Sequence, residues 1–233
     1  MRVLALNGSP RGSHGNTHQF LAPFLEGLQT AGAAVDRQEV RRLNVRPCTG
    51  CFRCWLGDGS CAVTDDDMAE LLRRVAESET LVLATPIYVD HVPGPLKTVV
   101  DRFLPLAVPR IELVDGHCRH PRREPLAGLK RVVLVSVCGF YELDNFYPTV
   151  AWVQAMCRNL QCEFAGSLLR PHVHFFTSTP AEAPPRQAVT EALRRAGQEL
   201  VSSGRVTLET ETAVAAPLVS LETFLEAANA SWK

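Results

Sequence analysis

Four cysteines, Cys48, Cys51, Cys54 and Cys61, crowd into one short segment of the chain. The spacing C-x2-C-x2-C-x6-C wraps one loop around a single centre and supplies four thiolates. Structural zinc sites usually take two C-x2-C pairs that a longer spacer separates, so the compact run favours a 4Fe-4S cluster over zinc. A ferredoxin run gives its last cysteine to another cluster, whereas this single run predicts one self-contained cluster. Zinc, or no metal at all, remain the alternatives.

A second group of polar residues follows the first apolar run of the chain. The run from Val3 to Leu6 leads into a loop rich in glycine, serine and asparagine, and then into a helix-period stripe from Phe20 to Leu28. A loop that enters a helix in this way presents unpaired backbone N–H groups and the positive end of the helix dipole, which suits a phosphate. Short side chains add donors there: Ser9, Ser13, Asn16 and Thr17.

The glycines of this loop restrict which phosphate it could hold. Gly8, Gly12 and Gly15 do not have the G-x-G-x-x-G spacing of a dinucleotide turn, and no Gly-Lys-Ser/Thr sequence closes a Walker loop. A terminal monophosphate therefore fits better than a pyrophosphate or a triphosphate. The alternative is an ordinary loop between a strand and a capped helix.

Strand and helix signals alternate along the chain, which predicts a parallel sheet with helices on both faces. The predicted strands lie near residues 3–6, 34–40, 81–84, 131–137 and 164–169. One predicted helix follows Asn16, and another begins with an N-cap at Thr64. Three more cover residues 94–103, 145–159 and 185–204, and the last runs through the tail from Leu221 to Trp232.

In sheets of this kind, ligands bind outside the carboxyl ends of the strands, where the strand order reverses. We therefore expect residues 8–17, 85–94 and 138–141 to converge. Pro86, Ile87, Tyr88, Gly139 and Phe140 are flat, apolar or rich in accessible backbone, which suits one edge and face of a planar ring system. Tyr88 and Phe140 could equally be ordinary core or surface aromatics. The cysteine segment follows the second strand, so we expect it on the same side as the phosphate loop.

The chain has 233 residues, 46% of them hydrophobic, and a formal net charge of -1. This predicts one α/β domain over residues 1–204, with a hairpin insertion at about 107–128 around Asp115-Gly116, and a tail over residues 205–233 that contributes to oligomerisation. The charge gives no general case for nucleic acid or an anionic membrane as partner. The sequence has no apolar run of the ~20 residues that a membrane span needs and no signal-peptide layout, which predicts a cytoplasmic protein.

The remaining reactive side chains give weaker signals. Cys118, Cys138, Cys157 and Cys162 are scattered and are expected to be inert thiols. His172 and His174 read as surface groups at a strand end, and Asp65 to Asp67 as a helix-capping cluster. No nucleophile triad is recognisable, and we name no catalytic residue.

With these motifs in view, the sequence resembles the flavodoxin-like NAD(P)H-dependent FMN reductases and, more narrowly, the iron-sulfur flavoproteins. The matching segments span roughly residues 2–170. They are Gly8 to Thr17, the C-x2-C-x2-C-x6-C run, Asp65 to Met68, Thr85 to Tyr88, and Pro95 to Arg102.

The resemblance implies a flavodoxin-like doubly wound five-stranded parallel sheet of order 2-1-3-4-5 that binds FMN. The FMN phosphate would be bound by Ser9, Arg11, Ser13, Asn16 and Thr17. The isoalloxazine would be bordered by Thr85, Pro86, Ile87, Tyr88, Cys138, Gly139 and Phe140. The resemblance also implies a homodimer or homotetramer in which the cluster lies near a flavin of a neighbouring subunit.

These observations predict an FMN-dependent oxidoreductase that passes electrons from NAD(P)H or a reduced ferredoxin to an acceptor through FMN and a 4Fe-4S cluster. The acceptor could be a quinone, oxygen or another protein. One alternative is an NAD(P)H-dependent FMN or quinone reductase without a cluster. The others are an electron carrier without turnover of its own and a redox sensor or binding module that uses the cysteines.

Overall fold

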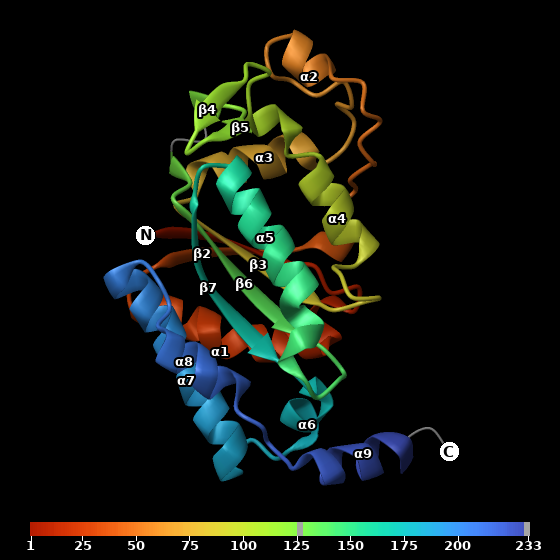
Figure 1. The fold of residues 1–233 in the computed structure, drawn as a ribbon, viewed down its shortest axis with the longest axis vertical. Helices are drawn as coiled ribbons and strands as arrows, with labels where there is room; N and C mark the ends of the chain where they lie inside the picture. Colours follow the sequence, from red (N-terminus) through yellow and green to blue (C-terminus); the bar gives the residue numbers. More distant parts are fainter. Residues whose placement is uncertain (125–127, 231–233) are drawn as a thin grey trace.

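A computed structural model describes residues 1–124 and 128–230 of the chain. Its centre is a five-stranded parallel sheet of order β2-β1-β3-β6-β7 (Figure 1). The strands are β1 (Arg2–Asn7), β2 (Ala34–Glu39), β3 (Thr80–Pro86), β6 (Arg131–Val137) and β7 (Glu163–Arg170). Counted without the hairpin strands, this is the predicted order 2-1-3-4-5, which is confirmed.

The alternation of side chains along the strands creates a hydrophobic core on each face of the sheet. Val3 and Ala5 face one core, and Leu4 and Leu6 face the other. The first core is covered by α1 (Asn16–Thr30), α6 (Val173–Ser178), α7 (Pro184–Ser203) and α8 (Leu208–Ala215). The second core is covered by α3 (Met68–Glu77), α4 (Gly94–Asp101) and α5 (Tyr147–Asn159).

Two glycines let α1 and α7 approach each other closely. A Cβ atom at Gly27 would lie 2.1 Å from the carbonyl oxygen of Arg194, and one at Gly197 would lie 2.5 Å from the backbone nitrogen of Leu28. Neither position has room for a side chain unless one helix moves. The contact keeps α7 seated against α1 over the same face of the sheet.

The start of α3 differs from the prediction. The helix begins at Met68 with Asp67 at the N-cap, so the predicted N-cap Thr64 lies outside it. Asp66 and Asp67 instead accept hydrogen bonds from the backbone N–H groups of Arg46 and Asn44, at 3.0 and 2.7 Å. The acidic run is therefore used to bind an incoming loop as well as to begin the helix.

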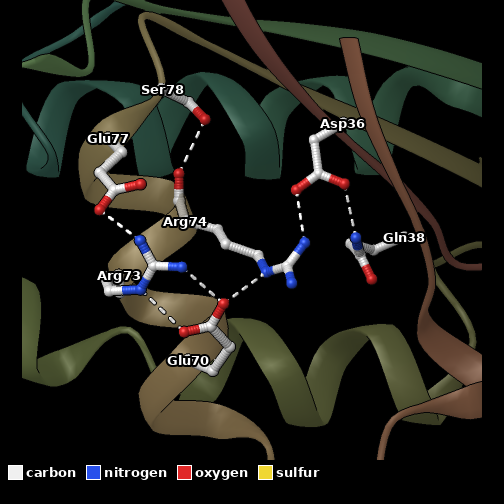
Figure 2. A network of polar contacts seen from close by, with 7 residues as sticks. All are labelled: Asp36, Gln38, Glu70, Arg73, Arg74, Glu77 and Ser78. Carbon is white, nitrogen blue, oxygen red and sulfur yellow. Dashed lines mark hydrogen bonds and ion pairs between the residues drawn. The ribbon is translucent and has the colours of Figure 1, made fainter.

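A chain of exposed charges connects α3 to the edge strand β2 (Figure 2). Glu70 accepts hydrogen bonds from Arg73 and Arg74, and Arg74 continues to Asp36 of β2 at 2.7 Å. Exposed ion pairs of this kind contribute little to stability one by one, although a connected network orients the side chains more firmly. It also gives the outer strand of the sheet a charged border.

The segment that follows α7 packs along β7, the strand at the opposite edge of the sheet. The N–H group of Ser167 donates to the Glu211 carboxylate at 2.6 Å, and the N–H group of Val206 donates to the carbonyl of Ala165 at 2.8 Å. Burial raises the pKa of Glu211 above its usual range. The predictions did not include α8, which carries Glu211.

The predicted hairpin insertion is present. Strands β4 (Glu112–Val114) and β5 (His117–Arg119) pair antiparallel around Asp115 and Gly116, which both have positive φ. Part of the predicted insertion, residues 125–127, lies outside the described residues. Short helical turns complete the chain: η1 (Gly12–His14), η2 (Val40–Arg42), α2 (Arg53–Leu56), η3 (Leu104–Leu106) and η5 (Leu143–Phe146).

The tail helix α9 (Leu221–Ala230) projects at one end of the molecule beside α6 (Figure 1). None of its described residues is buried, and its predicted end at Trp232 lies outside the described residues. Within the described parts of the chain, the helices are all too short or too polar to cross a membrane.

Candidate functional site

The three segments that were expected to converge meet at one pocket at the carboxyl ends of β1, β3 and β6. Predicted site residues from all three segments line it: Ser9, Arg11, Asn16, Thr17, Pro86, Ile87, Tyr88, Cys138 and Gly139. Three further lining residues were not predicted: Val137, Val173 and His174. The pocket lies at the carboxyl ends of β1 and β3, which are neighbours in the sheet. The chain leaves β1 toward α1 on one face and leaves β3 toward α4 on the other, and such a reversal is the position at which these sheets bind ligands.

The loop that follows β1 is shaped by its own hydrogen bonds. The N–H group of Ser9 donates to Asn7 Oδ1 at 3.1 Å, and the N–H group of Gly12 donates to the Ser9 carbonyl at 2.9 Å. Position 15 has little room for a side chain, because a Cβ atom at Gly15 would lie 2.5 Å from Ser9 Oγ. The polar atoms of the loop are therefore held in place before any ligand binds.

The helix α1 begins at the floor of this loop with its first turn open. Its N-cap is Gly15, which has no side chain to cap the first backbone N–H groups. The side chains of Asn16 and Thr17 lie beside those groups in the pocket lining, and Arg11 adds a positive charge. The Nδ2 donor of Asn7, just before the loop, is buried without a partner among the described residues. This concentration of donors fits an anionic group such as a phosphate.

The other side of the pocket is flat and apolar. The N–H group of Ile87 donates to the Val137 carbonyl at 2.8 Å, which continues the sheet pattern and lays the backbone of residues 86–88 beside β6. At Gly139 a Cβ atom would have no described heavy atom within 4 Å, so this part of the lining is open. A planar ring could therefore lie against exposed backbone rather than against bulky side chains.

Cys138 lies between these two walls as a neutral thiol. Burial raises its pKa to about 11, and its Sγ donates to the Phe140 carbonyl at 3.4 Å. A thiol of this kind carries little thiolate at neutral pH and makes a poor nucleophile. The prediction that Cys138 is an inert, buried thiol therefore agrees with its surroundings.

Three predicted site residues do not line the pocket. Thr85 is fully buried and donates to the Pro86 carbonyl at 2.9 Å, so it supports the wall from behind. Ser13 lies in η1, and Phe140 is 65% exposed next to the pocket.

His174 is exposed, as predicted for a surface group, and it is also a polar residue of the pocket lining. Its Nδ1 lies 3.3 Å from Asn16 Nδ2, which links α6 to the start of α1. The signal that could have indicated it is its place just after the carboxyl end of the last strand.

His172 is not a surface group, which corrects the prediction. Its side chain is 1% exposed, its Nε2 accepts from the N–H group of Leu218 at 3.2 Å, and its ring stacks on Tyr141. Burial, together with the charge of Arg170, lowers the pKa of His172 to about 4. The tail residues that cover it are distant in sequence.

The four clustered cysteines lie in the segment between η2 and α3. Cys54 is buried, Cys61 is half-buried, and Cys48 and Cys51 are exposed, all as free thiols. Burial raises the pKa of Cys54, and the neighbouring thiols of Cys61, Cys48 and Cys51 raise it further. The other three thiols therefore lie near enough to Cys54 to act on its pKa. Among the described residues, no three His, Cys, Asp or Glu side chains adopt the arrangement of a single-ion site.

This segment leaves the neighbourhood of the phosphate loop and continues past α4. Trp55 Nε1 donates to the Leu104 carbonyl at 2.9 Å, and Arg123 donates to the Cys54 carbonyl at 3.4 Å. The segment thus packs beyond the carboxyl end of α4, whereas Tyr88 of the pocket precedes that helix. In Figure 1, α2 lies at the end of the long axis opposite to α6. The expectation that both sites lie on one side of the molecule stays a prediction.

A parallel sheet of this order, with a donor-rich loop and an open helix N-terminus at its point of reversal, defines a flavodoxin-like protein. The family model described as NADPH-dependent FMN reductase matches residues 1–139. The chain belongs to this family.

Two relatives illustrate the similarity. An iron-sulfur flavoprotein of Archaeoglobus fulgidus is 39% identical over 105 residues, which cover 45% of this chain and 46% of that protein. An FMN-dependent NAD(P)H:quinone oxidoreductase of Pseudomonas aeruginosa is 29% identical over 151 residues, 59% of this chain and 68% of that protein. The chain spans about half the length of the first of these relatives.

The fold is also similar to that of an FMN-dependent NADH-azoreductase from Bacillus anthracis that was solved in complex with FMN. The TM-score is 0.63 at 15% identity, and the match covers 86% of this chain and 99% of the other. At this identity, the comparison supports the fold alone.

Proposed function

We propose that the protein is an FMN-dependent oxidoreductase that accepts reducing equivalents from NAD(P)H or a small reduced redox protein. The observation that carries this proposal is the pocket itself, which joins a donor-rich helix N-terminus to a flat wall of exposed backbone. The family match supports FMN as the cofactor. A terminal monophosphate would sit at the start of α1, and the ring system would lie along the wall.

The pocket residues have distinct roles in this proposal. Ser9, Arg11, Asn16 and Thr17 would bind the phosphate, with Ser13 as a neighbouring donor. Pro86, Ile87, Tyr88, Cys138 and Gly139 would border the isoalloxazine. Thr85 would fix the Pro86 carbonyl from behind, and Phe140 would lie at the rim.

When bound, FMN supplies the electron chemistry, and the protein binds, orients and shields it. The apolar wall would exclude water from one side of the ring. Cys138 would remain protonated beside it, because burial holds its pKa near 11. We assign no catalytic acid or base to this chain.

We also propose that Cys48, Cys51, Cys54 and Cys61 hold one 4Fe-4S cluster. Four free thiols in one loop, three of which act on the fourth, Cys54, form a donor set that suits a cubane, whose thiolates stand further apart than the ligands of one ion. The name of the relative from Archaeoglobus fulgidus supports the same assignment. The alternative is an FMN or quinone reductase with no cluster, as the name of the relative from Pseudomonas aeruginosa suggests.

The flavin proposal is tested by the cofactor that the purified chain releases and by two pocket variants. Mass spectrometry should identify FMN and not FAD. Arg11→Gln and Asn16→Ala should each raise the dissociation constant for FMN about tenfold, since contacts to a charged group are worth roughly 1.5–3 kcal/mol. Arg158→Gln, a change of an exposed arginine on α5, is the matched control. Release of FAD, or unchanged FMN affinity in both pocket variants, would contradict the assignment.

Turnover separates an enzyme from a carrier. The FMN-loaded chain should reduce a quinone or ferricyanide with NADPH or NADH through many cycles. A single reduction without further cycles would favour the electron carrier.

The cluster proposal is tested by anaerobic reconstitution. The wild-type chain should bind about four irons and show a broad absorbance near about 400 nm beneath the flavin bands. Cys54→Ala should abolish the iron but retain FMN. Cys118→Ala, a change of an exposed cysteine outside the segment, should alter neither. A wild-type chain that binds no iron or labile sulfide would contradict the cluster proposal, and the FMN or quinone reductase without a cluster would remain.

A further inference from the structure

A buried ion pair lies at the base of the cysteine segment. The side chains of Arg102, directly after α4, and Asp66, just before α3, are 1% and 0% exposed, and Arg102 Nη1 lies 2.8 Å from Asp66 Oδ2. Burying two charges has a high desolvation cost unless further hydrogen bonds satisfy them. This pair therefore needs further hydrogen-bond partners, and the cysteine segment supplies them.

Arg102 binds both ends of the cysteine segment. Its Nη1 donates to the carbonyl of Arg46 at 2.7 Å, and its Nη2 donates to the carbonyl of Val63 at 3.4 Å. Asp66 completes the arrangement, because its Oδ2 accepts from the N–H group of Arg46 at 3.0 Å. Arg46 precedes Cys48 by two positions, and Val63 follows Cys61 by two. One guanidinium group thus closes the segment into a loop.

The guanidinium has one donor left over. Its Nε is buried and has no partner among the described residues. Burial works against the charge of Arg102, but Asp66 and the nearby thiol of Cys61 raise its pKa above the usual value. A positive charge therefore lies near Cys61, and one buried N–H group of the same side chain has no partner among the described residues.

We propose that Arg102 is the positioning residue of the metal–thiolate site, closing the loop so that Cys48 and Cys61 meet and offering its free Nε–H to sulfur. This inference rests on the proposed cluster. Groups that hydrogen-bond to metal ligands orient them, and hydrogen bonds to cluster sulfur together with nearby charge set the reduction potential. Lysine cannot replace this function, since an ammonium group cannot reach Asp66 and two carbonyls in a planar fork.

The test compares Arg102→Gln and Arg102→Lys with the wild-type chain and with Arg46→Gln. The side chain of Arg46 makes an ion pair with exposed Asp65, and its carbonyl, which Arg102 binds, is unchanged by the substitution. Each protein is reconstituted anaerobically. Iron, labile sulfide and bound FMN are then measured, together with the rate at which a chelator removes iron and the midpoint potential of the cluster.

We expect both Arg102 variants to lose iron to the chelator about 10–100-fold faster than wild type, the usual range for a lost supporting contact. Arg102→Lys, which retains the charge, should keep FMN at full occupancy, and its cluster should have a lower midpoint potential because the Nε–H donor is gone. Arg46→Gln should match wild type. If Arg102→Gln fails to fold, as loss of bound FMN would show, Arg102→Lys decides alone.

Two outcomes would overturn the inference, and they are distinguishable. Wild-type iron retention and potential in Arg102→Lys would remove the role of Arg102 and leave the cluster in place. A wild-type chain that takes up no iron would remove the cluster itself and this role with it.

Discussion

Arg170 shows how a single buried side chain connects distant parts of this chain. Its guanidinium donates to the carbonyls of Val214, Ala215 and Ala216, at 2.9, 3.1 and 2.9 Å. These carbonyls end α8, where a helix favours a positive charge. Burial lowers the pKa of Arg170 to about 10, which leaves it charged at neutral pH. The end of β7 is therefore fixed to the end of α8 by charge-assisted hydrogen bonds.

His172, two residues further on, makes stability depend on pH. Its pKa is about 4 in the folded chain against 6.5 when exposed, so between these values the unfolded chain binds the extra proton. Its contribution is present above pH 6.5 and is lost as the pH falls toward 4. Each pKa unit corresponds to about 1.4 kcal/mol, so the loss between pH 6.5 and pH 4 is on the order of 3 kcal/mol.

We expect His172→Gln to flatten this part of the pH profile of the free energy of unfolding. Glutamine can still accept from the N–H group of Leu218 but does not titrate. Urea unfolding of both proteins at pH 4.5, 5.5 and 7.0 measures the difference. His174→Gln, a change of the neighbouring pocket histidine, is the control. An identical slope in wild type and His172→Gln would refute the assignment.

For single residues, the sequence predicted the hydrogen-bond donors of the pocket more reliably than it predicted which side chains are buried. Ser9, Asn16 and Thr17 were identified because a strand, a polar loop and a helix follow one another locally. His172 was misplaced because its cover comes from Leu218 and Tyr141, and only the folded chain brings these together. Arg102 was noticed as part of a motif, but its role at both ends of the cysteine segment depends on tertiary contacts.

At the level of helices and strands, the close packing of α1 against α7 depends on Gly27 and Gly197. Alanine is normally favoured over glycine inside a helix by about 1 kcal/mol. At Gly197 we expect the opposite sign, because the new Cβ would lie 2.5 Å from backbone atoms of α1. Gly197→Ala should lower the free energy of unfolding by at least about 2 kcal/mol through overpacking.

Gly94→Ala is the matched control for this prediction. Gly94 is exposed at the start of α4, and a Cβ atom there would meet no described atom within 4 Å. The substitution should change stability by less than about 0.5 kcal/mol or increase it slightly. Denaturant unfolding of both variants gives the comparison. A stable Gly197→Ala variant would show that the helices can separate at little cost.

The long elements were predictable, and the short ones were not. β3, β6 and α7 carry continuous apolar runs or clear helical stripes, so their places followed from periodicity. α6 and α8 are short, and what stabilises them is packing on the sheet rather than a pattern of their own. The N-cap hydroxyl of Thr207, which accepts from the N–H group of Thr210, was a local signal for α8 that could have been used.

The tail is bound to the pocket loop. Tyr141 donates from its hydroxyl to the Val219 carbonyl at 3.0 Å, and Phe224 of α9 packs against both Tyr141 and His172. Phe140, next to Tyr141, accepts from the N–H group of His172 at 2.6 Å. The position of α9 is thus connected to the loop that would border the flavin.

For the whole molecule, we expect a homodimer or homotetramer. Leu221 and Leu225 of α9 are exposed, as are Ile111 and Leu113 of the hairpin and Val89, which is 96% exposed beside the pocket. Such apolar surface favours a partner. In Figure 1, α2 lies at the end of the molecule away from α6, and we expect the cysteine segment to approach a pocket of a second copy.

Light scattering at micromolar concentration checks this expectation. The full chain should have at least twice the monomer mass, and a variant shortened after Pro217 should shift toward the monomer. Flavin content reports whether the shortened chain still folds. A monomeric full-length chain would contradict the prediction without affecting the pocket. The division into a domain over residues 1–204 and an oligomerising tail stays a prediction until then.

The treatment of the two sheet edges has a consequence for how the molecule behaves in crowded solution. An unprotected edge strand recruits strands from other molecules and so begins aggregation. Here β2 presents Asp36 and Arg37 at its edge, and the N–H group of Ser167 on β7 already donates to Glu211. The charges on β2 and the hydrogen bonds already made along β7 both oppose the addition of a further strand. Copies of this chain can therefore meet through helices and loops without the sheet growing into a fibre.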